Sequence, residues 1–351
     1  MIYLKYLSFP KTYSLFYSVC SFAALMMTLF GVILSLVSCG VLGIWVGMEL
    51  NFLGAVCFMS GIYVEESESV MKYFIVQVMG SCFLILGILM MVYPYFSFSV
   101  ESFILLGLSV KLGIFPFYFW VPGVMSSLSW FACFIVSVVQ KIAPLWFLCN
   151  FCFGNSIINL IEVMAVLTSM VGCLGGLGML NYRALMGYSS LVHLGFLVIL
   201  SLTEVSFFMG YLVFYSLLNG GLMWSLWVLG VYSYSDFICE GSFIYYMEFW
   251  WVALYFFSLS GIPPFSGIFL KVYFLVSCWT FAPLGCVVCF LSSAVSMYFY
   301  MSVLMEMLIF WGKSTSNMVS GVNNWNISKV MVVSLLVNLV ISYPLFLLSG
   351  V

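Results

Sequence analysis

Residues 100–123 read VESFILLGLSVKLGIFPFYFWVPG, and this stretch decides how the chain folds. It is long and apolar enough for a helix that crosses a membrane, which needs roughly 20 such residues. Lys111 lies about midway along it, and Gly113, Pro116 and Pro122 interrupt the helix just beyond the lysine. At membrane depth, a charge and a helix break are tolerated only inside protein or beside a wet cavity. The stretch therefore predicts a broken helix within a bundle of membrane helices.

The composition of the whole chain agrees with this interpretation. Of its 351 residues, 65% are hydrophobic and 6% are charged, whereas an average soluble domain is about 25% charged. This excludes a water-soluble fold and a disordered chain. The nine Lys and Arg residues are too few to build a nucleic-acid-binding surface. The sequence indicates a multi-pass membrane protein.

Apolar stretches of the required length predict about eleven transmembrane helices in an all-α bundle. The links between them are short, and the longest polar ones span 65–69, 233–242 and 313–328. Residues 1–351 therefore form a single integral membrane domain, with a core at roughly 40–280 and C-terminal helices at 283–351. The N-terminal segment fits neither a signal peptide nor a transit peptide, so we expect the first helix to remain in the mature protein. The predicted spans are 15–38, 41–63, 71–93, 100–120, 127–150, 157–180, 185–203, 206–232, 247–278, 283–311 and 330–349.

The basic residues divide into two groups. Six of the nine lie on the faces that share the N-terminus, and the opposite loops contain none. The positive-inside bias then predicts an N-terminus on the cytoplasm-like side, which in a mitochondrion is the matrix. The other three, Lys111, Lys141 and Lys271, lie inside predicted spans, and Glu49 lies inside the second span. The first group is Lys5, Lys11, Lys72, Arg183, Lys313 and Lys329.

Charged residues inside a membrane span predict a functional site. Desolvation lowers the pKa of a lysine, and a nearby carboxylate raises it again, so a lysine that alternates between these surroundings binds and releases a proton. Moving a proton against roughly 150–200 mV costs about 3.5–4.6 kcal/mol. A pKa swing of about three units supplies a similar amount. The alternative for each lysine is a side chain that reaches the membrane surface, most plausible for Lys271.

A second interruption resembles the first. Residues 260–267 read SGIPPFSG and precede Lys271 by one helical turn. Broken helices in two separated parts of a chain are typical of transporters built from repeated halves, with the ion handled near the breaks. An internal duplication is therefore a hypothesis for this chain.

His193 is the single histidine and follows Ser189 and Ser190. Its ordinary pKa near 6.5 suits proton transfer, and a hydrogen-bonded core histidine is an equal alternative. Glu162 lies inside the sixth span, where an interfacial side chain is the simpler interpretation. Two CxxC spacings, Cys149/Cys152 and Cys286/Cys289, have no nearby partners of the kind a zinc or iron–sulfur site needs, so we interpret them as small apolar residues.

Seven stretches, in order and together spanning roughly residues 40–275, resemble the subunit 2 family of mitochondrial NADH dehydrogenase, an antiporter-like membrane subunit of respiratory complex I. They begin with WVGMELN (45–51), KYF (72–74) and a stretch from KLG (111–113) to FWVP (119–122). They continue with QKIAPL (140–145), GGL (175–177), YSSLVHLG (188–195) and LSGIPPFSGIFLK (259–271).

The resemblance implies roles for five residues. Glu49 is similar to a carboxylate that modulates the first lysine, and Lys111 and Lys271 to the lysines of the two broken helices. Lys141 is similar to the central relay lysine, and His193 to a polar residue between the central and distal lysines. The family often has His and Glu where this chain has Tyr118 and Gly123, so those two positions are left out of the relay.

The resemblance also implies partners, location and cofactors. The expected partners are other complex I membrane-arm subunits, including antiporter-like neighbours, and membrane lipids, with no nucleic acid. The expected location is the mitochondrial inner membrane. We expect this subunit to bind no metal and no cofactor, because NADH, FMN, iron–sulfur clusters and ubiquinone are used elsewhere in the complex.

Three functions are compatible with the sequence to different degrees. The favoured one is a proton-translocating subunit of complex I, an NADH:ubiquinone oxidoreductase. The alternative is a cation/proton antiporter subunit outside complex I, which shares the lysines and breaks but usually has a longer chain. A receptor or scaffold is disfavoured, because large soluble loops are absent and a scaffold has no need for three lysines in hydrocarbon.

Overall fold

The computed structural model describes residues 19–60, 64–91, 97–234, 236, 246–263, 265–315 and 338. Within these ranges the chain is helical, with one isolated β-bridge between Asn181 and Ser233. The predicted all-α bundle is therefore confirmed. Its α-helices are α2 (Val19–Val37), α3 (Val41–Met59), α4 (Val64–Met90), α5 (Ser97–Leu112), α6 (Trp120–Met125), α7 (Trp130–Phe134), α8 (Gln140–Asn150), α9 (Asn155–Gly175), α10 (Tyr182–Ser201), α11 (Val205–Leu229), α13 (Tyr246–Ser260), α14 (Ser266–Cys278) and α15 (Pro283–Thr315). Two short segments join them, the 3-10 helix η3 (Phe117–Phe119) and the π-helical η4 (Ile135–Val139).

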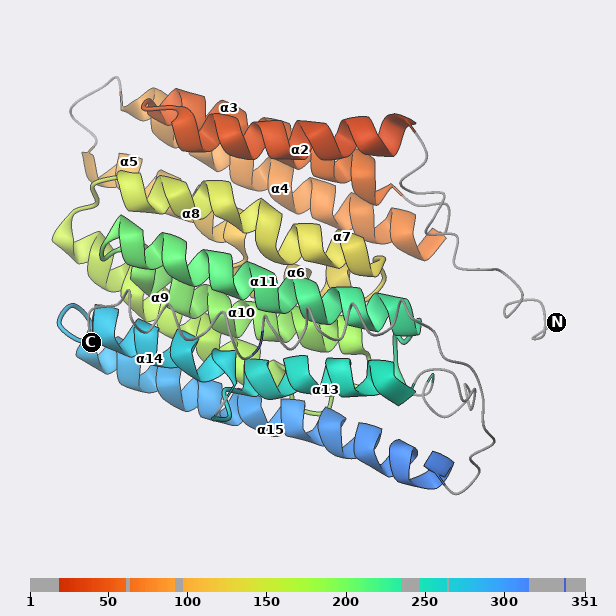
Figure 1. The fold of residues 1–351 in the computed structure, drawn as a ribbon. Helices are drawn as coiled ribbons and strands as arrows, with labels where there is room; N and C mark the ends of the chain where they lie inside the picture. Colours follow the sequence, from red (N-terminus) through yellow and green to blue (C-terminus); the bar gives the residue numbers. More distant parts are fainter. Residues whose placement is uncertain are drawn as a thin grey trace.

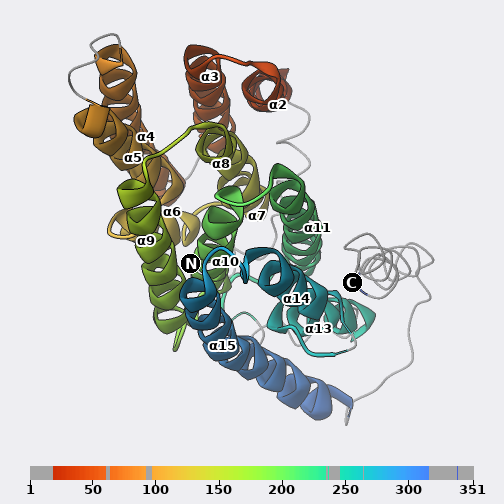
Figure 2. The same ribbon diagram turned by 90° about the vertical axis from the view of Figure 1, so that its left-hand side faces the viewer.

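The long helices lie side by side with similar axis directions, as a membrane bundle requires (Figure 1). Seen from the end of the bundle, α2 and α3 lie at one edge and α15 at the other, with α10 in the middle (Figure 2). α10 contacts α6, α8, α9, α11, α14 and α15. It is also 94% buried over its most apolar window, compared with 33% for α2. Groups on α10 are therefore placed to connect the two sides of the bundle.

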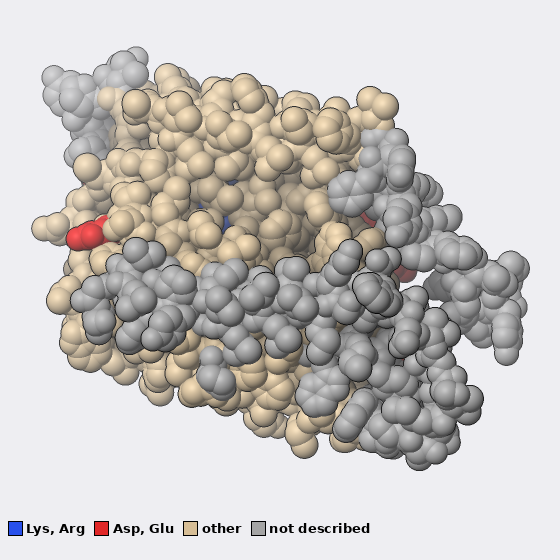
Figure 3. Space-filling view, in the orientation of Figure 1, with Lys and Arg blue, Asp and Glu red and all other residues tan. Residues whose placement is uncertain are grey.

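The predicted spans correspond closely to the observed helices. Among the described residues, nine helical segments are long and apolar enough to cross a membrane, and the α13–α14 pair supplies a further, interrupted one. The predicted span 330–349 lies outside the described residues except for Asn338, as do Lys5, Lys11 and Lys329. On the face shown in Figure 3, the described surface is nearly free of charged side chains, as contact with lipid requires.

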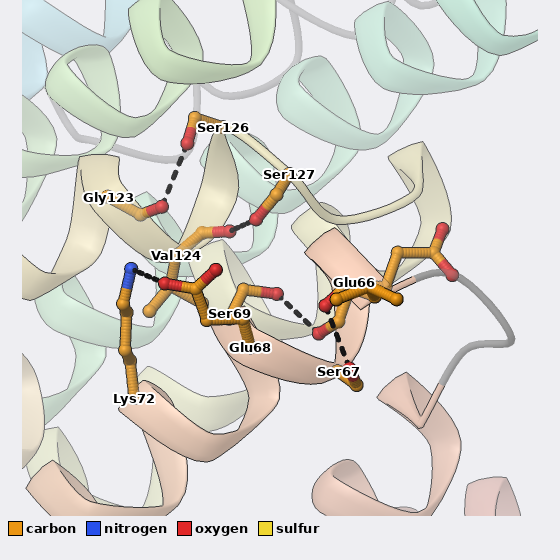
Figure 4. Close-up of polar contacts among 10 residues, drawn as sticks. Glu66, Ser67, Glu68, Ser69, Lys72, Gly123, Val124, Ser126 and Ser127 are labelled. Atoms are coloured by element: carbon orange, nitrogen blue, oxygen red, sulfur yellow. Dashed lines mark hydrogen bonds and ion pairs between the residues drawn. The ribbon is translucent and has the colours of Figure 1, made fainter.

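The beginning of α4 differs from the prediction. Residues 65–69 were expected to form a polar link, but α4 already begins at Val64. Glu65 and Glu66 lie in its first turn, where negative charge stabilises a helix. One turn later, Lys72 Nζ lies 2.8 Å from Glu68 Oε1, and both side chains are more than half exposed (Figure 4). Short-range charge patterning thus extends the helix beyond its apolar part.

Glycines bring several neighbouring helices unusually close. A Cβ atom on Gly47 of α3 would lie 2.7 Å from the backbone nitrogen of Ser35 on α2. A Cβ atom on Gly107 of α5 would lie 2.8 Å from the backbone nitrogen of Leu84 on α4. Small residues at such contacts are a common way to pack helices in membranes, where the hydrophobic effect does not drive helices together.

Both predicted helix breaks are present and end in the same way. α5 ends at Leu112 and α13 ends at Ser260, and each is followed by a glycine in the left-handed region, Gly113 at φ 76° and Gly261 at φ 77°. An isoleucine comes next in both cases, and its amide donates to the carbonyl five residues earlier, Ile114 to Ser109 and Ile262 to Phe257. Glycine is the residue that adopts this conformation without strain. The shared geometry supports the hypothesis of an internal duplication.

Candidate functional site

Lys111 and Glu49 form a buried ion pair at the first break. Lys111 lies in the last turn of α5, and its Nζ donates to Glu49 Oε1 of α3 at 2.6 Å. The side chains of Lys111 and Glu49 are 3% and 22% exposed, respectively. Gly80 of α4 leaves room for the lysine, because a Cβ there would lie 2.8 Å from Lys111 Cγ. The pairing that the sequence predicted is therefore present, and the negative charge comes from a neighbouring helix.

The carbonyls at the broken end of α5 are bonded by neutral groups. Trp120 Nε1 of α6 donates to the carbonyl of Val110 at 3.2 Å, and Gln77 Nε2 of α4 donates to the carbonyl of Lys111, also at 3.2 Å. The last carbonyls of a helix have no partner within the helix. Because these two side chains supply the missing donors, the Lys111 ammonium is left for Glu49.

At the second break, the lysine ammonium bonds a backbone carbonyl instead of a carboxylate. It lies on α14, and its Nζ donates back to the carbonyl of Ser260, the last residue of α13, at 2.6 Å. Its side chain crosses Gly261, where a Cβ would lie 2.8 Å from both Cε and Nζ of the lysine. Among the described residues, no carboxylate pairs with Lys271. The lysine is 9% exposed and folds inward rather than reaching for a membrane surface.

Lys141 lies directly after the π-helical segment η4, at the start of α8. Its Nζ donates to the carbonyl of Ser190 on α10 at 2.9 Å, and the residue is 4% exposed. Pro144, one turn later, lies inside α8 and has no amide hydrogen to donate. A π-helical turn of this kind inside a helix is frequently found at functional sites.

His193 lies one turn after Ser190 on α10, and it is 6% exposed. Its Nδ1 lies 2.8 Å from the hydroxyl of Tyr211 on α11, and its ring packs 4.8 Å from the ring of Tyr215. The imidazole is close enough to Lys141 and Lys271 to interact with the charges of both. A tyrosine hydroxyl can donate or accept, so it can accompany the imidazole in either protonation state.

α10 connects these groups. Its Ser190 carbonyl holds Lys141, its His193 follows one turn later, and its Phe196 stacks on Phe274 of α14 at 4.7 Å. Phe274 is three residues from Lys271, so the part of α14 that carries this lysine packs against α10. The structure thus brings Lys111 to Glu49, and brings Lys141, His193 and Lys271 around one central helix.

Sequence reasoning missed the neutral polar residues that bond the helices around these charged groups. Gln77, Asn51, Gln140 and Asn219 all form hydrogen bonds inside the bundle. Their signal was present, because a carboxamide in an apolar span is costly unless it is bonded. The backbone carbonyls of Ser190 and Ser260, which accept from Lys141 and Lys271, could not be predicted from the sequence, because every residue has a carbonyl.

The cysteines of the CxxC spacings and Glu162, which the sequence also singled out, form no hydrogen bond or ion pair with the buried lysines or His193 in the part of the chain that the structure describes. The thiols of Cys149, Cys152, Cys286 and Cys289 are free, and the last two are fully buried. Over the described ranges, no group of three or more His, Cys, Asp or Glu residues could hold a metal ion. Glu162 is half-buried on α9, with its carboxylate against Gly285 of α15.

Buried ammonium groups and two broken helices in one membrane bundle are typical of proteins that carry protons or cations across membranes. Residues 38–297 match the family described as NADH:quinone oxidoreductase/Mrp antiporter, transmembrane. NADH-ubiquinone oxidoreductase chain 2 of Anopheles gambiae is 31% identical over 331 residues, which cover 90% of this chain and 93% of that protein. The chain therefore belongs to this antiporter-like family, on the branch of the chain 2 subunits.

Solved structures share the fold. Respiratory complex I of Thermus thermophilus contains a chain with a TM-score of 0.75 and 18% identity, covering 91% of this chain and 77% of that one. An archaeal membrane-bound sulfane sulfur reductase contains another with a TM-score of 0.78 and 17% identity, covering 93% of this chain and 73% of that one. The fold thus occurs in more than one respiratory complex, and the chain 2 sequence match distinguishes among them.

Proposed function

We propose that this chain is a proton-translocating subunit of the membrane arm of respiratory complex I, and that Glu49, Lys111, Lys141, His193 and Lys271 carry the proton. The observation on which this depends is the burial of three ammonium groups inside membrane spans, each within 3 Å of an acceptor oxygen. Electron transfer from NADH to ubiquinone takes place in other subunits and drives the movement of protons here.

Each residue has a distinct part in this proposal. Glu49 stabilises the protonated form of Lys111, so a change in their distance changes the proton affinity of the lysine. Lys141 and Lys271 are bonded to backbone carbonyls, which stabilise an ammonium less than a carboxylate does. Lys111 therefore holds its proton more tightly than Lys141 or Lys271 while Glu49 is close, and it passes the proton on when the distance to Glu49 increases. His193 lies between the second and third lysines and can pass a proton from one to the other.

The proposal extends to surroundings and cofactors. We place the chain in the mitochondrial inner membrane, with the N-terminus on the matrix side and antiporter-like complex I subunits as neighbours. The animal relatives and the distribution of basic residues support this placement. The chain binds no redox cofactor or metal of its own. The alternative of a cation/proton antiporter outside complex I shares the fold, and the match to chain 2 relatives over nearly their whole length favours complex I.

The test is a substitution of Lys141 in the assembled complex. Lys141→Met keeps a side chain of similar length without a titratable group, so we expect NADH-driven proton pumping to fall about tenfold or more, as for the loss of a proton-transfer group. Assembly should survive, because the buried charge is removed rather than left unpaired. Pumping is measured with a pH-sensitive dye in vesicles of known complex content.

Lys72→Met is the matched control, because Lys72 is exposed and pairs with Glu68 of the same helix, away from the buried lysines. It should leave pumping per NADH unchanged. An assembled Lys141→Met complex that pumps as many protons per NADH as the native complex would exclude Lys141 from the relay.

A further inference from the structure

Two carboxamide side chains join the helix of Glu49 to the helix of Lys141. Asn51 Nδ2 donates to the carbonyl of Val139 at 3.3 Å. Gln140 Nε2 donates to Asn51 Oδ1 at 2.9 Å and to the Asn51 carbonyl at 3.1 Å. Asn51 is 1% exposed. Three hydrogen bonds therefore connect α3 with the junction of η4 and α8.

The sequence of α8 explains why this junction needs an outside donor. In an α-helix, the amide of residue 144 would bond the carbonyl of residue 140, and in a π-helix that of residue 139. Residue 144 is proline and has no amide hydrogen. Asn51 Nδ2 donates to one of these two carbonyls, that of Val139. The helix that carries Glu49 thus supplies a side-chain donor at the junction where Pro144 cannot donate.

The positions along the chain make this contact relevant to the relay. Asn51 follows Glu49 by two residues, and Gln140 immediately precedes Lys141. α3 therefore touches Lys111 through its carboxylate and the Lys141 junction through its carboxamide. We propose that Asn51 and Gln140 are positioning residues that couple the Glu49–Lys111 pair to Lys141.

The coupling is mechanical. Carboxamides do not titrate near neutral pH, so Asn51 and Gln140 do not carry the proton themselves. When Lys111 gains or loses its proton, its attraction to Glu49 changes and α3 shifts. The three hydrogen bonds transmit that shift to the η4–α8 junction and change the distance between Lys141 and its acceptor on α10. This proposal deepens the proposed function and rests on it.

A second buried asparagine offers a comparison on the same segment. Asn219 of α11 donates from Nδ2 to Ser137 Oγ of η4 at 2.9 Å, and it is as deeply buried as Asn51. α11 does not contact the Glu49–Lys111 pair through any hydrogen bond in the described part of the chain. Asn219 therefore supports the π-helical segment without a connection to Glu49.

The test is a set of double substitutions in the whole complex, with pumping measured per NADH oxidised. Asn51→Leu should lower pumping about two- to tenfold. Coupled residues give non-additive effects, whereas independent ones multiply their fold-changes. Glu49→Gln combined with Asn51→Leu should therefore pump within about twofold of Glu49→Gln alone. Glu49→Gln combined with Asn219→Ala should instead show the product of the two single effects.

The outcomes separate the proposals. If the double variant Glu49→Gln, Asn51→Leu loses pumping by the product of the two single fold-changes, the coupling is overturned. This holds even if Lys141→Met abolishes pumping. An unaffected Lys141→Met complex would instead remove the relay on which the coupling rests. If Asn51→Leu prevents assembly, Gln140→Met removes two of the three hydrogen bonds, leaves the Asn51–Val139 bond in place and gives the same comparison with Glu49→Gln.

Discussion

The two broken helices end alike but hold their lysines in opposite ways. At the first break, Lys111 precedes the left-handed glycine and pairs with a carboxylate from another helix. At the second, Lys271 follows the glycine by ten residues and bonds the broken helix end itself. The partial negative charge of a helix C-terminus stabilises a cation modestly, whereas a carboxylate carries a full charge. The same helix ending, a left-handed glycine, thus occurs beside two lysines whose ammonium groups are stabilised to different extents.

The second break is the more sensitive to a single methyl group. Gly261→Ala places a Cβ 2.8 Å from the Lys271 ammonium nitrogen at a backbone φ that side chains rarely adopt. We expect pumping per NADH to fall about tenfold or more, because the lysine loses its position as well as its acceptor. The measurement is dye-detected pumping in assembled complex I.

Gly230→Ala is the control that separates backbone strain at the glycine from displacement of the Lys271 side chain. Gly230 has φ 70°, and its added Cβ would meet no atom within 4 Å. It carries the same backbone penalty, about 1–2 kcal/mol, without touching a relay residue. Equal losses of pumping in the two variants would mean that strain alone explains the effect at Gly261.

The first break depends on its countercharge. Glu49→Gln keeps the shape of the side chain and removes the charge beside Lys111. We expect pumping to fall roughly fivefold, which corresponds to about 1 kcal/mol, the upper end of the range for an ion pair that water can reach. Glu68→Gln breaks the exposed pair with Lys72 and should change pumping by less than about twofold. Similar effects of the two variants would contradict a special role for the buried pair.

Adding a methyl group beside Lys111, at Gly80, should disturb pumping less than adding one beside Lys271, at Gly261. Gly80→Ala would bring a Cβ within 2.8 Å of Lys111 Cγ and 3.2 Å of the Gly107 carbonyl oxygen, but α4 has ordinary helical geometry there, so no left-handed strain is added. We expect pumping to fall only about two- to threefold, because the overpacking cost of about 1–3 kcal/mol falls mainly on stability and leaves the Lys111–Glu49 pair able to form. Gly123→Ala, which meets no atom within 4 Å, is the control. A larger loss for Gly80→Ala than for Gly261→Ala would reverse the comparison between the breaks.

The neutral cap at the first break should matter least. Trp120→Phe removes the hydrogen bond to the Val110 carbonyl and keeps an aromatic ring beside Tyr73. We expect a loss of stability of about 1–3 kcal/mol from the unbonded carbonyl, seen as faster thermal inactivation of the complex. Pumping per NADH at moderate temperature should be unchanged, and a drop there would assign Trp120 a part in the relay.

The fold was predictable wherever hydrophobicity alone sets it. Apolar length located the spans, and the Gly–Pro stretches after Lys111 and before Lys271 located the breaks. The start of α4 was missed because Glu65, Glu66 and the Glu68–Lys72 pair extend a helix that hydropathy does not detect. Of the site, the Glu49–Lys111 pairing followed from the family resemblance, in which Glu49 is similar to a carboxylate that modulates the first lysine. The acceptors of Lys141 and Lys271 did not, because backbone carbonyls are set by tertiary packing.

The deep burial of α10 affects how the bundle responds to lipid. Its residues are apolar enough to enter a bilayer unaided, yet the finished bundle hides nearly all of them from lipid. Almost all of α10 therefore contacts other helices rather than lipid, whereas only a third of the apolar window of α2 is buried in the bundle. A change in acyl-chain length or unsaturation therefore acts directly on α2 at the rim and reaches the helix of His193 only through its protein neighbours.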